Sequence, residues 1–174
     1  MRKRNNRRSS KGNSRNSSKN TPKITNKITE HFHKKEFMCP CGACSKKLKL
    51  SLGLIGGLEL LRSKIKKKLT IVKGYECAES AEKNKRIKRN FHLIGVAAVI
   101  TAEDTSTEDL FLAAEAIPEF KGLGLNLDEN TVYVDTRKED ERKTWVVKNK
   151  EEILIADENR AQYLAPEAPQ AEDA

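Results

Sequence analysis

The chain has 174 residues, of which 37% are hydrophobic and 5% aromatic, so its apolar content is enough for one modest core but not for two. Lys and Arg number 34 against 25 Asp and Glu, which gives a formal net charge of +9. No apolar stretch approaches the ~18–20 residues of a membrane-spanning helix, and the basic N-terminus lacks the roughly 7–15-residue apolar run of a secretory signal peptide. We therefore expect no membrane span, and a cytoplasmic or phage-associated location.

The positive charge is concentrated at the N-terminus. Residues 1–28 carry ten cations and no Asp or Glu, which leaves a charge of −1 for the rest of the chain. Residues 1–27 are expected to form a disordered basic arm, because they offer little apolar surface to offset the entropy of ordering. Such an arm can hold nucleic acid by counterion release, or it can act as a solubilising tail. The acidic, Ala- and Pro-rich residues 157–174 are expected to form a second disordered tail, so the predicted domain is 28–156.

Apolar spacing predicts the elements of the first half of the domain. Leucines and isoleucines three and four residues apart predict an amphipathic helix over residues 51–68, weakened by three glycines in its first turns. Residues 69–72 are a short β-prone run followed by a turn. The small and β-branched side chains of residues 94–101 are typical of a buried strand.

The sequence of the second half of the domain predicts one helix and three strands. A threonine cap and an acidic first turn begin a helix over residues 107–116, which Pro118 stops. Residues 122–126 and 131–136 are expected to form two strands around a turn, and residues 144–147 extend the sheet. We therefore predict an α+β domain in which an antiparallel sheet is flanked by helices.

A series of short motifs occurs in a fixed order along this domain. The motifs are TEHFHKKEFMCPCGAC at 29–44, LELLR at 58–62, IVKGY at 71–75, Asn84, NFHLIGVAAVI at 90–100, GLG at 122–124, and VYVDTR at 132–137 with Trp145. In this order they resemble the zinc D-alanyl-D-alanine carboxypeptidase family, which shares its fold with the Hedgehog signalling domain. The resemblance covers about residues 28–148 and implies a Hedgehog/DD-peptidase-like fold.

The resemblance also implies a catalytic zinc held by two histidines and one aspartate, with a fourth position left for water. His92 matches the first ligand, whereas Val99 stands at the aspartate position and Tyr133 at the second histidine position. Asp135 and Arg137 of the closing motif remain. Valine has no lone pair for a metal, and a phenol with a pKa of ~10 is a poor ligand at neutral pH. We therefore expect the fold to be retained and hydrolysis to be lost.

Other carboxylates do not restore this site convincingly. Glu103, Asp104 or Asp135 could supply oxygen ligands, but Glu103 lies four residues beyond Val99, roughly 13 Å along an extended strand. Glu76 stands where the resemblance implies an arginine near the substrate carboxylate, so the charge at this position is reversed.

Cys39, Cys41 and Cys44 lie close together in sequence, and Cys77 follows later. Four thiolates can form a closed structural zinc site. The alternative is that they bind no metal, since cysteines often occur in this region of the family that the chain resembles. A disulfide would require an oxidising compartment.

A run of basic residues leads directly to His92 and would border the cleft. Its members are Lys83, Lys85, Arg86, Lys88 and Arg89. This run predicts a positive rim that holds an anionic polymer such as a glycan, teichoic acid or nucleic acid, although many charge runs are only solvated faces.

Three functions are compatible with these patterns. The first is a catalytically inactive D-Ala-D-Ala carboxypeptidase-like protein that binds peptidoglycan or another anionic polymer. The second is an active zinc metallopeptidase that acts on cell-wall peptides. The third is a basic structural or nucleic-acid-binding protein related to phage particles. The altered ligand positions favour the first.

Overall fold

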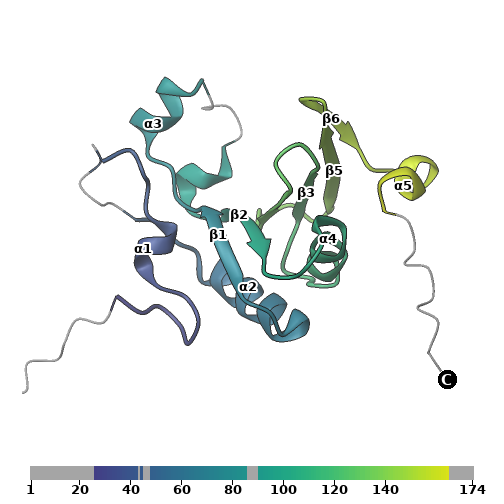
Figure 1. Ribbon diagram of the computed structural model, residues 1–174. Helices are drawn as coiled ribbons and strands as arrows, with labels where there is room; N and C mark the ends of the chain where they lie inside the picture. Colours follow the sequence, from purple (N-terminus) through teal and green to yellow (C-terminus); the bar gives the residue numbers. More distant parts are fainter. Residues whose placement is uncertain (1–25, 43, 45–47, 86–89, 165–174) are drawn as a thin grey trace, which may run out of the picture.

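A six-stranded mixed sheet organises the protein (Figure 1). The computed structural model describes residues 26–42, 44, 48–85 and 90–164. The sheet order is β1-β2-β4-β3-β5-β6, and the strands are β1 (Leu69–Lys73), β2 (Ala97–Ala102), β3 (Gly122–Asn126), β4 (Thr131–Asp135), β5 (Lys143–Lys148) and β6 (Glu151–Leu154). The helices are α1 (Lys34–Phe37), α2 (Leu52–Ile65), α3 (Ala78–Lys83), the 3-10 helix η1 (Phe91–Ile94), α4 (Thr107–Glu115) and α5 (Asp157–Tyr163).

The α+β class and both long helices agree with the sequence, but the prediction of a purely antiparallel sheet is wrong. Strands β3 and β5 are parallel, with Gly122 opposite Lys143. The chain leaves β4 beside the start of β3, crosses that end of the sheet and enters β5 in the same direction as β3. Arg142 fixes this crossing, because its guanidinium donates to the backbone carbonyls of Glu115, Ile117 and Phe120 over 2.5–2.9 Å. Alternating hydrophobicity locates a strand but carries no information on its direction.

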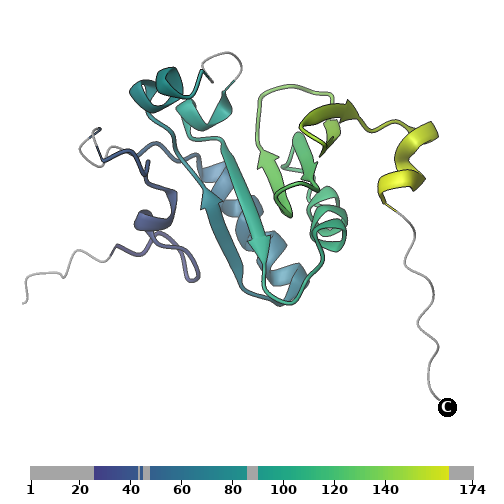
Figure 2. The same cartoon turned by 45° about the horizontal axis from the view of Figure 1, so that its top comes forward.

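Helices α2 and α4 bury one face of the sheet. Leu54, Leu58 and Leu61 of α2 are spaced by four and three residues, so they share one face of the helix, and each is 0% exposed. Phe111 of α4 is also fully buried in the same hydrophobic cluster. Figure 2 shows α2 behind β1 and β2. The opposite face of the sheet carries the residues of the candidate site.

The chain is ordered beyond residue 156, where a disordered tail was expected. Residues 157–163 form α5, and Leu164 is 6% exposed. The Asn159 side chain accepts a hydrogen bond from the Ala156 N–H over 2.9 Å, and Arg160 pairs with Glu115 of α4. The polar, Ala-rich composition gave little sign of this docking, because only Tyr163 and Leu164 pack on the core and the rest is held by a helix cap and one ion pair. The rest of the expected tail, residues 165–174, lies outside the described residues, as does nearly all of the predicted basic arm.

Within the described residues, no helix has the length and apolar composition needed to cross a membrane.

Replacing Leu58 by Ala should lower the free energy of unfolding by about 2–5 kcal/mol, because it leaves a cavity between α2 and the sheet. Leu60 of the same helix is 49% exposed, so Leu60→Ala should cost no more than about 0.5 kcal/mol. Urea denaturation of both variants checks this, and equal costs would contradict the assignment of the buried face.

Candidate functional site

Four cysteine side chains meet beside the start of α3. The sulfur atoms of Cys39, Cys41, Cys44 and Cys77 all lie within 4.8 Å of one another, and those of Cys41 and Cys77 are 3.4 Å apart. None of these four cysteines forms a disulfide in the structure. In the described part of the chain, no other group of three or more His, Cys, Asp or Glu side chains brings its ligand atoms together in this way. The four cysteines can therefore bind a metal ion together, as their sequence positions suggested.

A close approach between α1 and the end of β1 brings Cys77 to the other three cysteines. The Tyr75 N–H donates to the Phe37 carbonyl over 2.8 Å. A Cβ atom at Gly74 would lie 2.5 Å from the Phe37 Cα, so only glycine permits this contact. The motif that ends at residue 75 thus brings Cys77 to the other three cysteines.

Backbone N–H groups point at two of the sulfur atoms. The Cys77 N–H donates to the Cys39 Sγ, and the Ser80 N–H donates to the Cys77 Sγ, each over 3.4 Å. The bond from Ser80 lowers the pKa of Cys77, but burial and the three neighbouring thiols outweigh it and raise this pKa to about 12. A cation that binds here must therefore displace protons from the thiols.

The three positions that match zinc ligands of the resembling family lie together on the uncovered face of the sheet. Val99 of β2 is paired directly with Tyr133 of β4. The His92 ring packs edge-on against the Tyr133 ring, with 5.6 Å between ring centroids. His92 Nδ1 lies 2.7 Å from the Gly74 carbonyl, so Nδ1 carries the proton and Nε2 keeps its lone pair. The positions converge, but only His92 offers a ligand atom at neutral pH.

Tyr133 does not replace the missing histidine. Its hydroxyl donates to Asp135 Oδ2 over 2.9 Å. Burial raises the pKa of Tyr133 well above its usual range, and the charge of Asp135 raises it further. Asp135 is itself fully buried and paired with Arg137, whose Nη2 lies 2.5 Å from Oδ2. A catalytic zinc does not fit these residues, because the phenol stays protonated and the carboxylate is already bound.

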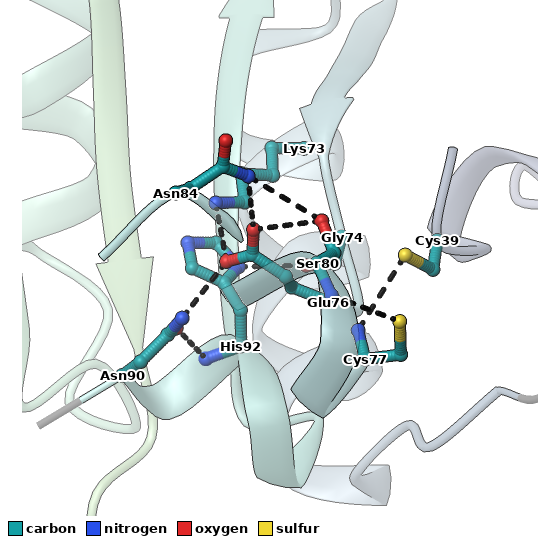
Figure 3. Close-up of polar contacts among 9 residues, drawn as sticks. All are labelled: Cys39, Lys73, Gly74, Glu76, Cys77, Ser80, Asn84, Asn90 and His92. Carbon is teal, nitrogen blue, oxygen red and sulfur yellow. Dashed lines mark hydrogen bonds and ion pairs between the residues drawn. The ribbon is translucent and has the colours of Figure 1, made fainter. Parts of the chain in front are cut away.

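Glu76 is the centre of a buried polar cluster beside His92 (Figure 3). It is 2% exposed and accepts hydrogen bonds from Lys73 at 2.8 Å, Ser80 at 3.1 Å, Asn84 at 3.2 Å and Asn90 at 2.8 Å. Burial raises the pKa of Glu76, but these donors outweigh burial and lower it to about 2. The carboxylate therefore acts inside the fold and presents no free negative charge to a ligand, contrary to the role inferred from its position in sequence.

Glu103 and Asp104, two of the proposed replacement ligands, lie apart from this cluster, whereas the third, Asp135, is held by Tyr133 and Arg137. Asp104 follows β2 and pairs with Lys67 over 3.8 Å, at the end of the strand away from His92. Lys83 and Lys85 are exposed at the end of α3. Arg86, Lys88 and Arg89 lie outside the described residues.

A groove of about 630 Å³ runs over the uncovered face of the sheet. Its floor follows one row of residues across neighbouring strands, in the order Val99, Tyr133, Gly124, Trp145 and Leu154. The Tyr133 and Trp145 rings lie 5.2 Å apart. A Cβ atom at Gly124 would lie 2.7 Å from the Trp145 indole, so the glycine makes room for the ring over β3.

One end of the groove is closed by stacked side chains. The Arg137 guanidinium lies 4.3 Å from the centroid of the Phe91 ring and 6.0 Å from that of Trp145. A Cβ atom at Gly122 would lie 2.2 Å from Asp135 Oδ2, so this glycine leaves space for the Asp135–Arg137 pair. The rim adds polar side chains from Asn126, Glu129, Thr131, Lys143 and Glu152.

Sequence reasoning did not identify the groove or the donors around Glu76. Two glycines two residues apart in β3, followed by the single tryptophan, are the signal that could have pointed to a bare strand under an aromatic ring. The donors around Glu76 are common polar residues from separate segments, and no spacing in the sequence connects them.

Comparison with known proteins adds no family to this description. No family model matches the chain, and neither curated proteins nor solved structures gave a match. The chemistry open to the chain follows from the residues above: a thiol cluster that can bind a metal, and an aromatic groove beside a lone histidine.

Acid should destabilise the protein in two steps. Burial and the charge of Lys73 lower the pKa of His92 from 6.5 to about 4, so the stability due to neutral His92 is complete above pH 6.5 and is lost between pH 6.5 and 4. The pKa of Glu76 falls from 4.5 to about 2, so its contribution is complete above pH 4.5 and is lost as the pH falls toward 2. Urea denaturation measured across this range checks both steps.

The Glu76→Gln variant tests the second acid step, the loss of stability between pH 4.5 and 2, separately from the first. This variant should lose the decline between pH 4.5 and 2 and should be less stable at pH 7 by about 1–3 kcal/mol, because buried donors lose a charged acceptor. Glu79→Gln, at an exposed position of α3, is the matched control and should retain the decline. A Glu76→Gln variant with the full acid profile would contradict the role assigned to this carboxylate.

Proposed function

We propose that the protein is a non-hydrolytic module of the DD-peptidase-like fold that binds the glycan of peptidoglycan in the sheet groove. The observation that carries this proposal is the row of residues across the groove floor. Val99 and Tyr133 occupy the positions that the resemblance assigns to metal ligands, and the row continues into Trp145. The same positions that would exclude a catalytic zinc extend an apolar and aromatic floor.

The shape and composition of the groove favour a sugar ring as the ligand. Aromatic rings bind the apolar faces of sugars, while amide, hydroxyl and carboxylate side chains at the rim can bind their hydroxyl and N-acetyl groups. Asn126, Thr131 and Glu152 provide such groups in the row adjacent to the aromatic floor.

The charges in the groove favour a neutral ligand over a polyanion. Arg137 is neutralised by Asp135, and Lys143 lies 3.1 Å from Glu139. Glu129 and Glu152 add negative charge to the rim. An anionic polymer would therefore depend on Lys83, Lys85 and the cations outside the groove. Nucleic-acid binding through residues 1–27 is supported by charge alone.

The fluorescence of Trp145 tests this proposal directly, because Trp145 is the only tryptophan of the chain. Titration with soluble N-acetylated glycan strands from peptidoglycan should shift and saturate its fluorescence, since a ring stacked on the indole excludes water from it. Glu152→Ala, at an exposed position of the rim, should weaken binding by roughly 5- to 30-fold through the loss of a rim hydrogen bond.

Two controls accompany the titration. Glucose-based oligosaccharides without N-acetyl groups should bind more weakly, and Leu60→Ala, on the far side of the sheet, should bind as tightly as the wild type. No release of D-alanine from cell-wall peptides is expected from the wild type or from His92→Ala. An unchanged fluorescence at millimolar glycan would reject the groove as the binding site, and D-alanine release that depends on His92 would reject the loss of hydrolysis.

We propose further that the four cysteines hold one Zn²⁺ as a structural site. Tetrahedral zinc at about 2.3 Å from each thiolate separates the sulfur atoms by about 3.8 Å, close to the present spacing. All sulfur atoms are within 4.8 Å, so binding requires only small movements. Four thiolates leave no open position for water, and the N–H groups of Cys77 and Ser80 would support the thiolate charge.

Metal analysis by mass spectrometry should find one zinc per full-length chain. Cys77→Ser should lower zinc affinity by at least tenfold and also lower the melting temperature, because Cys77 connects the cluster to α3. His92→Ala should leave the zinc content unchanged. Zinc that is lost with His92 and kept in Cys77→Ser would contradict this assignment.

A further inference from the structure

We propose that the cysteine cluster is a peroxide-sensitive zinc site, in which oxidation joins Cys41 to Cys77 and releases the metal. This inference rests on the structural zinc proposed above. It adds a covalent modification at two named sulfur atoms and a condition under which the metal leaves.

The geometry selects one pair of sulfur atoms. The Sγ atoms of Cys41 and Cys77 are 3.4 Å apart, closer than the roughly 3.8 Å expected across a tetrahedral zinc. They are 36 residues apart in sequence, so a bond between them would connect the segment after α1 to the start of α3. The two sulfur atoms need to approach by only about 1.4 Å to reach the S–S bond length of about 2.05 Å.

The two sulfur atoms differ in solvent exposure, which assigns them different roles in the oxidation. Cys41 is half-buried, whereas Cys77 is 6% exposed. A small oxidant such as hydrogen peroxide can therefore reach Cys41 and the equally half-buried Cys44, but the 3.4 Å contact makes Cys41 the one that Cys77 resolves. Cys39 is 7% exposed and has its sulfur bonded by the Cys77 N–H, so it is shielded from the same attack.

The chemistry balances with peroxide as the only oxidant. The Cys41 thiolate attacks one peroxide oxygen, the O–O bond breaks, and the products are a sulfenic acid and hydroxide. The Cys77 thiolate then attacks the Cys41 sulfur and expels a second hydroxide, which forms the S–S bond. Two thiolates are oxidised, one peroxide is reduced, and two protons from solvent convert the hydroxides to water. Zinc remains Zn²⁺ throughout and is released, because only the thiolates of Cys39 and Cys44 are left to hold it.

When the disulfide replaces the zinc, the segment after α1 stays connected to the start of α3. Without the metal, the segment after α1 would be held at this corner by two hydrogen bonds, from Tyr75 to Phe37 and from Cys77 to Cys39, and by packing against Tyr75. A disulfide from Cys41 to Cys77 ties the same two segments covalently. The protein can therefore lose zinc under oxidation without losing the packing of this corner, and reduction in the presence of zinc reverses the change.

The test uses the full chain loaded with one equivalent of zinc and freed of excess metal. Hydrogen peroxide is added at one to five equivalents, zinc release is followed with a metallochromic indicator, and disulfides are mapped by mass spectrometry without reduction. We expect about one zinc released per chain, one linked peptide that contains Cys41 and Cys77, and recovery of zinc binding after treatment with dithiothreitol and zinc.

Two matched variants identify the pair. Cys44→Ser keeps both reacting sulfur atoms and should still form the disulfide, whereas Cys41→Ser should not form it. A chain that binds zinc but keeps it at five equivalents of peroxide would overturn this inference and leave the zinc site standing, as would a disulfide between any other pair. A wild-type chain that binds no zinc would overturn both.

Discussion

A buried negative charge must be matched by hydrogen-bond donors, and Glu76 meets this requirement with side chains from three separate segments. Lys73 comes from the end of β1, Ser80 and Asn84 from α3 and its C-terminus, and Asn90 from the residue that caps η1. The carboxylate therefore ties these three segments together. Cys77 of the cysteine cluster is the residue after Glu76, and Phe91 and His92 follow Asn90. Both candidate sites therefore depend on the Glu76 carboxylate.

The sequence predicts the elements whose signals are local, and it misses relations between distant residues. Helices α2 and α4 follow from apolar spacing and from caps that lie within a few residues. The parallel direction of β5 depends on Arg142 and three carbonyl groups more than 20 residues away, which no local pattern encodes. Helix α5 was missed for a similar reason, since Arg160 finds its partner in α4.

The candidate sites show the same difference between features that follow from local sequence and features that depend on distant residues. The convergence of three cysteines was readable from their spacing, and Cys77 joined them because Gly74 allows the backbone to approach Phe37. The positions of Val99 and Tyr133 were taken from the resemblance, and their pairing on adjacent strands agrees with a common site. The sequence predicted only a reversed charge at Glu76, because its neighbours in space, not its place in a motif, determine what a buried carboxylate does.

The last two strands supply one wall of the groove from a single short stretch of chain. Trp145, Val147, Glu152 and Leu154 all belong to the β5–β6 hairpin, which joins the rest of the sheet only along β3. The preceding four strands already form a continuous antiparallel sheet packed on α2 and α4. The hairpin, residues 143–154, is thus a contiguous segment whose outward side chains line the groove while Val146 packs in the shared core. Under the function proposed above, exchanging these groove-facing side chains would alter the ligand without altering the pairing of the other four strands.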